Sequence, residues 1–86
     1  MPKTRKPDFT RKLARTIEPT GCPGIELATL EDAARFIGHL RPWRQRRPVW
    51  DYAAELLLIA ATTGNPSDIG NATVQMERAL RVEGWL

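Results

Sequence analysis

The sequence holds one cysteine, Cys22, and one histidine, His39, in 86 residues. A lone cysteine cannot form an intramolecular disulfide, which excludes a disulfide-stabilised scaffold and favours a reducing, cytoplasmic setting. Zinc sites take several nitrogen, sulfur or oxygen ligands, and these two side chains are too few to make one. We therefore expect no metal ion and no other cofactor.

Recognisable catalytic constellations are also missing. A catalytic nucleophile needs a base beside it and a third group that orients this base. Cys22 lies in a stretch of Pro and Gly, His39 lies near the end of an expected helix, and no feature of the sequence ties the two together. The chain has no phosphate-binding loop with a Lys-Ser/Thr signature, and its carboxylates form no recognisable pair. The sequence thus predicts a protein that is not an enzyme and has no small-molecule substrate.

Long apolar runs are absent as well. The longest uninterrupted run covers residues 56–61, far short of the about 20 residues that a membrane-spanning helix needs. The basic N-terminus has no apolar segment behind it, so a secretory signal is not expected. With 42% apolar residues and seven prolines, the composition is typical of a small globular domain that has no contact with a membrane.

The charge is unevenly distributed. Residues 1–16 hold six basic residues and one acid, whereas residues 17–86 hold seven arginines and nine acids. The net charge of +3 therefore comes from the N-terminus. Residues 1–8 combine charge with two prolines and predict a disordered basic arm, followed by a single helical domain over residues 9–86. Such an arm attracts nucleic acid or acidic protein surfaces, or it serves only to keep the protein in solution.

The apolar spacing predicts an all-α fold, a small bundle of three main helices preceded by a short N-terminal helix. Phe9, Leu13, Ala14 and Ile17 recur at helical spacing, and Pro19 ends this first helix. The main helices are expected near residues 30–40, 49–63 and 66–83. Residues 25–27 have the composition of a brief extended segment, but no other part of the chain offers a convincing partner strand, so no sheet is expected.

Capping residues set the expected helix boundaries. Thr29 suits an N-cap, and with Asp32 three residues later it makes a variant of the capping box. Pro48 suits the first turn of the middle helix and Gly64 its end. Asn65 suits the cap of the last helix.

The middle helix is unusually apolar. Asp51 and Glu55 are its only charged residues, and apolar side chains occupy every face beyond its first two turns. A helix of this kind is either central in its own domain or completed by a partner, which includes a second copy of the chain.

The segment over residues 41–51, which leads into that helix, is the richest for binding. Arg41, Arg44, Arg46 and Arg47 are interleaved there with Trp43 and Trp50. Tryptophan and arginine are common anchors of protein interfaces, and arginine with an aromatic ring also suits phosphates and stacked bases. The third interpretation is purely structural: both tryptophans dock on the core while the arginines stay in water.

Residues 29–86 resemble the small uncharacterised all-helical proteins of rhizobia and their relatives. The similar parts are residues 29–37 (TLEDAARFI), residues 50–58 (WDYAAELLL), the turn at Gly64 and the closing residues 84–86 (GWL), and the stretch makes up about two-thirds of the chain. Proteins of that kind often lie on mobile elements. The resemblance implies a small regulator that titrates another protein, and it transfers no binding residue.

These features predict a non-enzymatic protein-interaction module, a small regulator (for example an antiactivator-type protein) that binds a protein partner or associates with itself. The residues expected to bind the partner are Trp43, Arg44, Arg46, Arg47 and Trp50. The alternative is a nucleic-acid-binding protein that uses the arm and the loop at residues 41–47. The residues expected to bind nucleic acid are Lys3, Arg5, Lys6, Arg11, Lys12 and Arg41.

Overall fold

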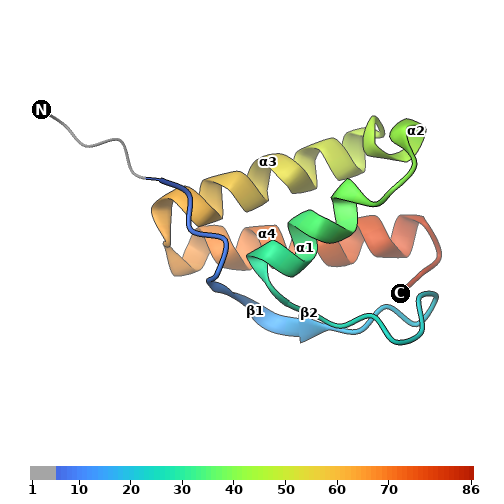
Figure 1. Cartoon of the computed structure of the whole chain (residues 1–86), viewed down its shortest axis with the longest axis horizontal. Coiled ribbons are helices and arrows are strands. Elements are labelled where there is room, and N and C mark those ends of the chain that lie inside the picture. Colours follow the sequence, from blue (N-terminus) through green and yellow to red (C-terminus); the bar gives the residue numbers. More distant parts are fainter. Residues whose placement is uncertain (1–5) are drawn as a thin grey trace, which may run out of the picture.

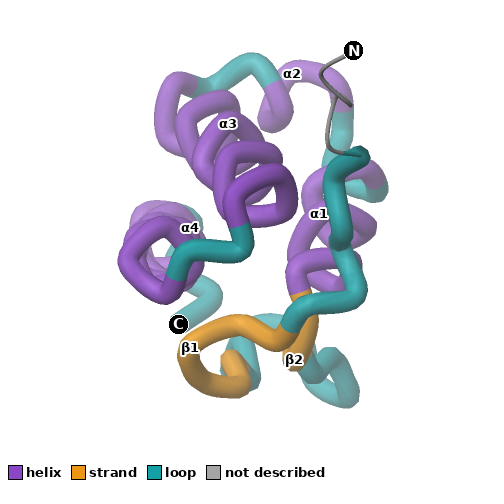
Figure 2. The backbone as a smooth tube through the Cα atoms, turned by 90° about the vertical axis from the view of Figure 1, so that its left-hand side faces the viewer, coloured by secondary structure: helices purple, strands orange, loops and turns teal. Residues whose placement is uncertain are grey.

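The computed structural model describes residues 6–86, which form two layers (Figure 1). The elements in chain order are β1 (Lys12–Ile17), β2 (Leu27–Thr29), α1 (Leu30–Gly38), α2 (Pro42–Gln45), α3 (Pro48–Thr63) and α4 (Pro66–Val82). One layer is the antiparallel pair of α3 and α4. In the other layer α1 packs on α3, β1 packs on α4, and β2 packs on both β1 and α1 (Figure 2). The second layer therefore covers one face of the helix pair.

The expected all-α class is wrong, because the segment predicted as a short N-terminal helix contains strand β1 and pairs antiparallel with β2, with a shift in register along the ladder. The prediction of a short N-terminal helix depends on Leu13 and Ile17. Their spacing of four residues places them on one face of a helix, but it also places them on one face of a strand, since side chains alternate along a strand. Both are buried, whereas Ala14, which the helical interpretation placed on the same apolar face, is exposed. Arg15, between them, is exposed and forms an ion pair with Glu77 of α4.

The segment around β1 also fixes the start of α1. The N–H groups of Leu30 and Glu31 donate to the carbonyl oxygens of Arg11 and Phe9 at 2.9 and 2.8 Å. N–H groups in the first turn of a helix have no partner within the helix, so this segment supplies acceptors that α1 itself lacks.

The predicted caps are confirmed. Thr29 and Asp32 form a complete capping box at the start of α1. Gly64 ends α3 with φ +65°, a left-handed conformation that glycine adopts without steric cost. Asn65 then accepts a hydrogen bond from the N–H of Ser67 at the start of α4. The three main helices accordingly lie close to the ranges that the sequence predicts.

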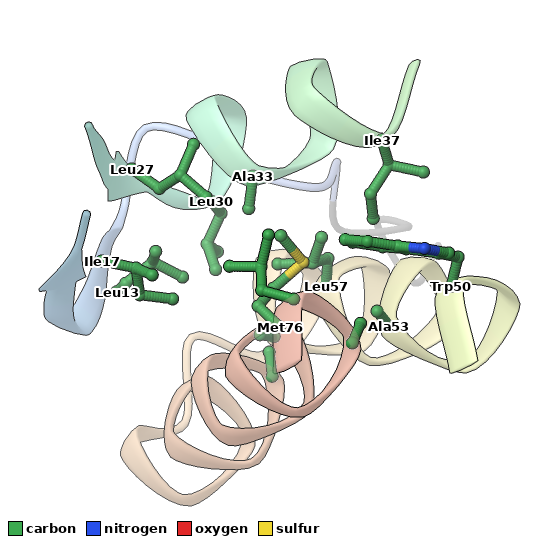
Figure 3. Close-up of a cluster of buried hydrophobic side chains, with 14 of the residues drawn as sticks. Leu13, Ile17, Leu27, Leu30, Ala33, Ile37, Trp50, Ala53, Leu57 and Met76 are labelled. Carbon is green, nitrogen blue, oxygen red and sulfur yellow. The ribbon is translucent and has the colours of Figure 1, made fainter. Parts of the chain in front are cut away.

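The core lies between the two layers (Figure 3). It consists of Leu13, Ile17 and Leu27 from the sheet, Leu30, Ala33 and Ile37 from α1, and Trp50, Ala53, Leu57 and Met76 among the residues of the helix pair. Since α3 faces this core on one side only, most of its surplus of apolar residues is left at the surface.

The two ends of the described chain are both held by the helices. The N–H of Asp8 donates to the carbonyl oxygen of Ala61 at 2.8 Å. At the other end, Gly84 turns the chain with φ +78°, and the N–H of Trp85 donates to the carbonyl oxygen of Leu80 at 2.8 Å. Within residues 6–86, no helix is long and apolar enough to cross a membrane.

Candidate functional site

The candidate site is built around α2, a single turn between α1 and α3. Pro42 begins this turn, and the side chain of Gln45 donates to the carbonyl oxygen of Leu40 at 2.8 Å, which closes the end of the α1 segment. Trp43 projects from α2 with half of its surface (50%) exposed. The short connection thereby holds a large aromatic side chain at the surface.

Glu83, just after α4, fixes the arginines around Trp43. Its side chain is only 2% exposed, and its two carboxylate oxygens accept hydrogen bonds from Arg44 and from Arg47, the latter at 2.8 Å. A buried carboxylate needs cationic partners, because desolvation is costly for an unpaired charge. The C-terminal end of α4 thus orders two side chains that come from the α2 region.

The fixed arginines in turn support Trp43. The guanidinium carbon of Arg44 lies 4.5 Å from the ring centroid of Trp43 and 4.9 Å from that of Trp85. The corresponding distance from Arg47 to Trp43 is 5.1 Å. Both cations are within the range of cation–π attraction, so the exposed ring is held in one place before any partner arrives.

Trp50, the second tryptophan of the predicted site, is not at the surface. It is completely buried, and its ring lies 5.9 Å from Phe36 and 6.4 Å from Trp85 between centroids. Its inclusion among the partner-binding residues is therefore corrected: Trp50 belongs to the core, as the purely structural interpretation has it. A tryptophan is large enough to fill the gap between two helices, and its place on α3 faces α1.

The remaining arginines make the surface around Trp43 basic. Arg41 and Arg46 are exposed, and neither makes an ion pair with any of the described residues. We call the set of Arg41, Trp43, Arg44, Arg46 and Arg47 the Trp43 surface. Four of the five predicted partner-binding residues lie on it, together with Arg41 from the nucleic-acid prediction.

The residues predicted to bind nucleic acid are not brought to one place. Lys3 and Arg5 lie outside the described residues. Lys6, Arg11 and Lys12 are exposed. Arg11 lies beside Gly64 in the turn between α3 and α4 and forms an ion pair with Asp8 at 3.9 Å. The Trp43 surface lies at the opposite end of α3, about 24 Å away for a helix of 16 residues (Figure 1).

Two residues of the site were missed by the sequence interpretation. Glu83 and Trp85 contact the arginines that surround Trp43, although both follow α2 by about 40 residues in the sequence. The only signal was that Trp85 follows Gly84, a residue typical of a helix end, from which the chain folds back. No pattern within the sequence links Glu83 to two particular arginines.

A hollow of about 260 Å³ elsewhere on the protein is lined in part by the single histidine. His39, Asp32 and Glu26 are among its lining residues. No hydrogen bond or ion pair in residues 6–86 joins His39 to either carboxylate, and Asp32 accepts from the N–H groups of Ala28 and Thr29. Cys22 is not part of this lining. Within the same residues, no cluster of three or more His, Cys, Asp and Glu side chains is placed to hold a metal ion.

Comparisons of the chain with protein-family models, with curated proteins and with solved structures gave no match. The resemblance of residues 29–86 to the rhizobial proteins stays an expectation from the sequence.

Proposed function

We propose that this protein is a non-enzymatic interaction module, a small cytoplasmic regulator that binds an acidic surface of a protein partner through the Trp43 surface. The observation that carries the proposal is the support of Trp43. Half of a tryptophan ring is exposed, and two arginines anchored on one buried carboxylate hold it in place.

This support favours binding for a thermodynamic reason. Ordering a side chain at an interface costs about 0.5–1.5 kcal/mol, and a side chain that is already ordered avoids this cost. Tryptophan and arginine are the residue types most enriched among the dominant contacts of protein interfaces. Arg41 and Arg46, which have no acidic partner in residues 6–86, would attract carboxylates of the partner around the central ring.

A protein partner is favoured over nucleic acid by two features. Guanidinium groups of Arg44 and Arg47 already lie over the ring of Trp43, where a base would have to stack. The basic residues near the N-terminus and those of the Trp43 surface, which the nucleic-acid prediction combines, are also separated by the length of α3 (Figure 1). The positive charge is therefore not gathered into one patch that could bind a phosphate backbone.

The proposal is tested by quantitative affinity purification from the native cell with wild-type protein, with Trp43→Ala and with Arg46→Glu as baits. The expected result is at least one protein whose recovery falls about tenfold or more with both variants, in keeping with the loss of an interface anchor. The control bait is Glu26→Gln, an exposed change away from the Trp43 surface, which should recover the same proteins as the wild type. Equal recovery with all four baits would refute the role of this surface.

A further inference from the structure

The face of the α3–α4 pair that lies away from α1 and the sheet carries uncovered apolar side chains. Tyr52 and Val74 are 49% and 43% exposed, and together with Leu56 they line a groove of about 290 Å³ between the two helices. Ile59 follows Tyr52 by seven residues and Val82 follows Val74 by eight, so each continues the same side of its helix. Both are exposed. We call this surface, defined by these five residues, the outer face.

The charges of the outer face are divided between its two helices. Asp51 and Glu55, which bracket Tyr52, are the only charged residues of α3, and both are exposed. Arg78, which lines the same groove from α4, is exposed and lies one turn from Val74. None of the three makes an ion pair with another described residue. The face therefore has an acidic edge on α3 and a basic edge on α4.

We propose that the outer face binds the outer face of a second copy of this chain, which gives a symmetric dimer with a four-helix core. A two-fold symmetric interface uses the same patch on both subunits, so the patch must be complementary to itself. A surface with one acidic and one basic edge beside an apolar groove meets this condition, because each edge finds its opposite on the second copy.

The charges also select the orientation of the two copies. If the two-fold axis runs across the helices, α3 faces α3 and acid meets acid. If it runs along the helices, α3 of one copy lies against α4 of the other. Residues at the same level along the helix axis in the two copies then face each other. Tyr52 and Arg78 share one groove, so they lie at similar heights. Asp51 and Glu55 of one copy then come within reach of Arg78 of the other, while Tyr52, Ile59, Val74 and Val82 are covered.

This inference does not depend on the Trp43 surface, since the two surfaces share no residue. A monomeric protein would leave the binding role of Trp43 untouched, and a Trp43 surface without a partner would leave the dimer untouched.

Sedimentation velocity of the full chain from about 10 to 500 μM tests the dimer. The wild type is expected to shift from monomer to dimer across this range. Glu55→Arg alone and Arg78→Glu alone should each weaken the dimer about tenfold or more, because like charges then face each other in both halves of the interface. Arg46→Glu, a charge reversal on the Trp43 surface, is the matched control and should leave the dimer unchanged.

Mixing the two variants separates a specific contact from a loss of folding. In a mixed dimer, the native Glu55 of one copy faces the native Arg78 of the other, and the two introduced side chains, which also have opposite charges, face each other. The equimolar mixture should therefore form a dimer at concentrations where each variant alone is monomeric. A wild type that stays monomeric at all concentrations would overturn the inference and leave the outer face to another protein. A mixture that associates no better than its components would overturn the proposed pairing.

Discussion

Glu83 and Arg44 are 39 residues apart in the sequence, yet they form an ion pair in which the carboxylate is almost completely buried. Glu83 holds Arg47 in the same way. The pair joins the end of α4 to the turn of α2, and it orders the arginines that support Trp43. The Trp43 surface is therefore a product of the tertiary fold.

Replacing Glu83 with Gln should lower both stability and order at this site. The variant loses two charge-assisted hydrogen bonds and leaves two cations without their acid, at an expected cost of about 2 kcal/mol in the free energy of unfolding. Urea unfolding measures this cost. The control is Glu31→Gln, which removes the pair with Arg35, in which both side chains are more than half exposed, and should cost less than about 1 kcal/mol. Equal losses in the free energy of unfolding for the two variants would show that the burial of Glu83 does not strengthen its ion pairs.

The two tryptophans of the α2–α3 region should respond in opposite ways to substitution. Trp43→Ala removes a half-exposed ring and should change the free energy of unfolding by less than about 1 kcal/mol while it weakens binding of the partner about tenfold or more. Trp50→Ala removes a completely buried ring and should cost about 3–5 kcal/mol. Thermal and urea unfolding compare the two variants. A large loss of stability in Trp43→Ala would mean that its ring serves the fold.

Thr73 should control the attachment of the strand to α4. Its hydroxyl oxygen accepts a hydrogen bond from the N–H of Ala14 at 3.0 Å, and its O–H group donates one to the carbonyl oxygen of Ile69 at 2.8 Å. In Thr73→Val the N–H of Ala14 loses its acceptor, at a cost of about 1–2 kcal/mol. Hydrogen exchange of the Ala14 amide should be faster in Thr73→Val and protected in Thr73→Ser, which keeps the hydroxyl. Equal protection in both variants would contradict this attachment.

Acid should remove the contribution of Asp32. The N–H of Ala28 is the main cause that lowers the pKa of this carboxyl below its ordinary value of 3.8, and bonds with Thr29 act in the same direction. Because the pKa is lower in the folded protein, the stabilisation is fully present above about pH 4 and is lost as the pH falls through the lowered pKa. Asp32→Ala should therefore be about 1 kcal/mol less stable than the wild type at neutral pH, and the difference should shrink at lower pH. A difference that is constant from pH 7 to the acid limit of the measurement would contradict the assignment.

Nucleic acid should bind weakly and without dependence on Trp43. The affinity for labelled oligonucleotides can be measured by fluorescence anisotropy at about 50 and 200 mM salt. Binding through phosphate contacts is recognised by an affinity that falls steeply between the two salt concentrations. The full chain is the right reagent, because a protein that begins at residue 17 would lack most of β1. Lys6→Ala and Arg11→Ala should reduce any affinity, whereas Trp43→Ala should not. Tight binding that Trp43→Ala abolishes would favour the nucleic-acid alternative.

The helices could be predicted because their signals are local. Thr29, Gly64 and Asn65 each stop or start a helix through contacts within a few residues, and those contacts form as the sequence indicates. The sheet could not be predicted in this way. Spacing of four residues between Leu13 and Ile17 fits both a helix and a strand, and only the pairing with β2 decides between them.

The candidate site was predictable in composition but not in arrangement. The sequence marks arginine and tryptophan in the segment before α3, but it cannot show which tryptophan faces the core. Trp50 is buried because it lies opposite α1, and Trp43 lies at the surface, where Glu83 fixes the two arginines that contact its ring. Both depend on contacts between elements that are distant in the chain.

The most direct test of the interaction role is photo-crosslinking in the native cell, with a benzophenone amino acid in place of Trp43. An aromatic replacement keeps the shape of the exposed side chain and reports what touches it. We predict a discrete adduct of defined mass at this position, strongly reduced by Arg46→Glu and absent when the crosslinker replaces Glu26. Adducts at position 43 that match those at position 26, or that ignore Arg46→Glu, would contradict the proposal that the Trp43 surface binds a protein partner.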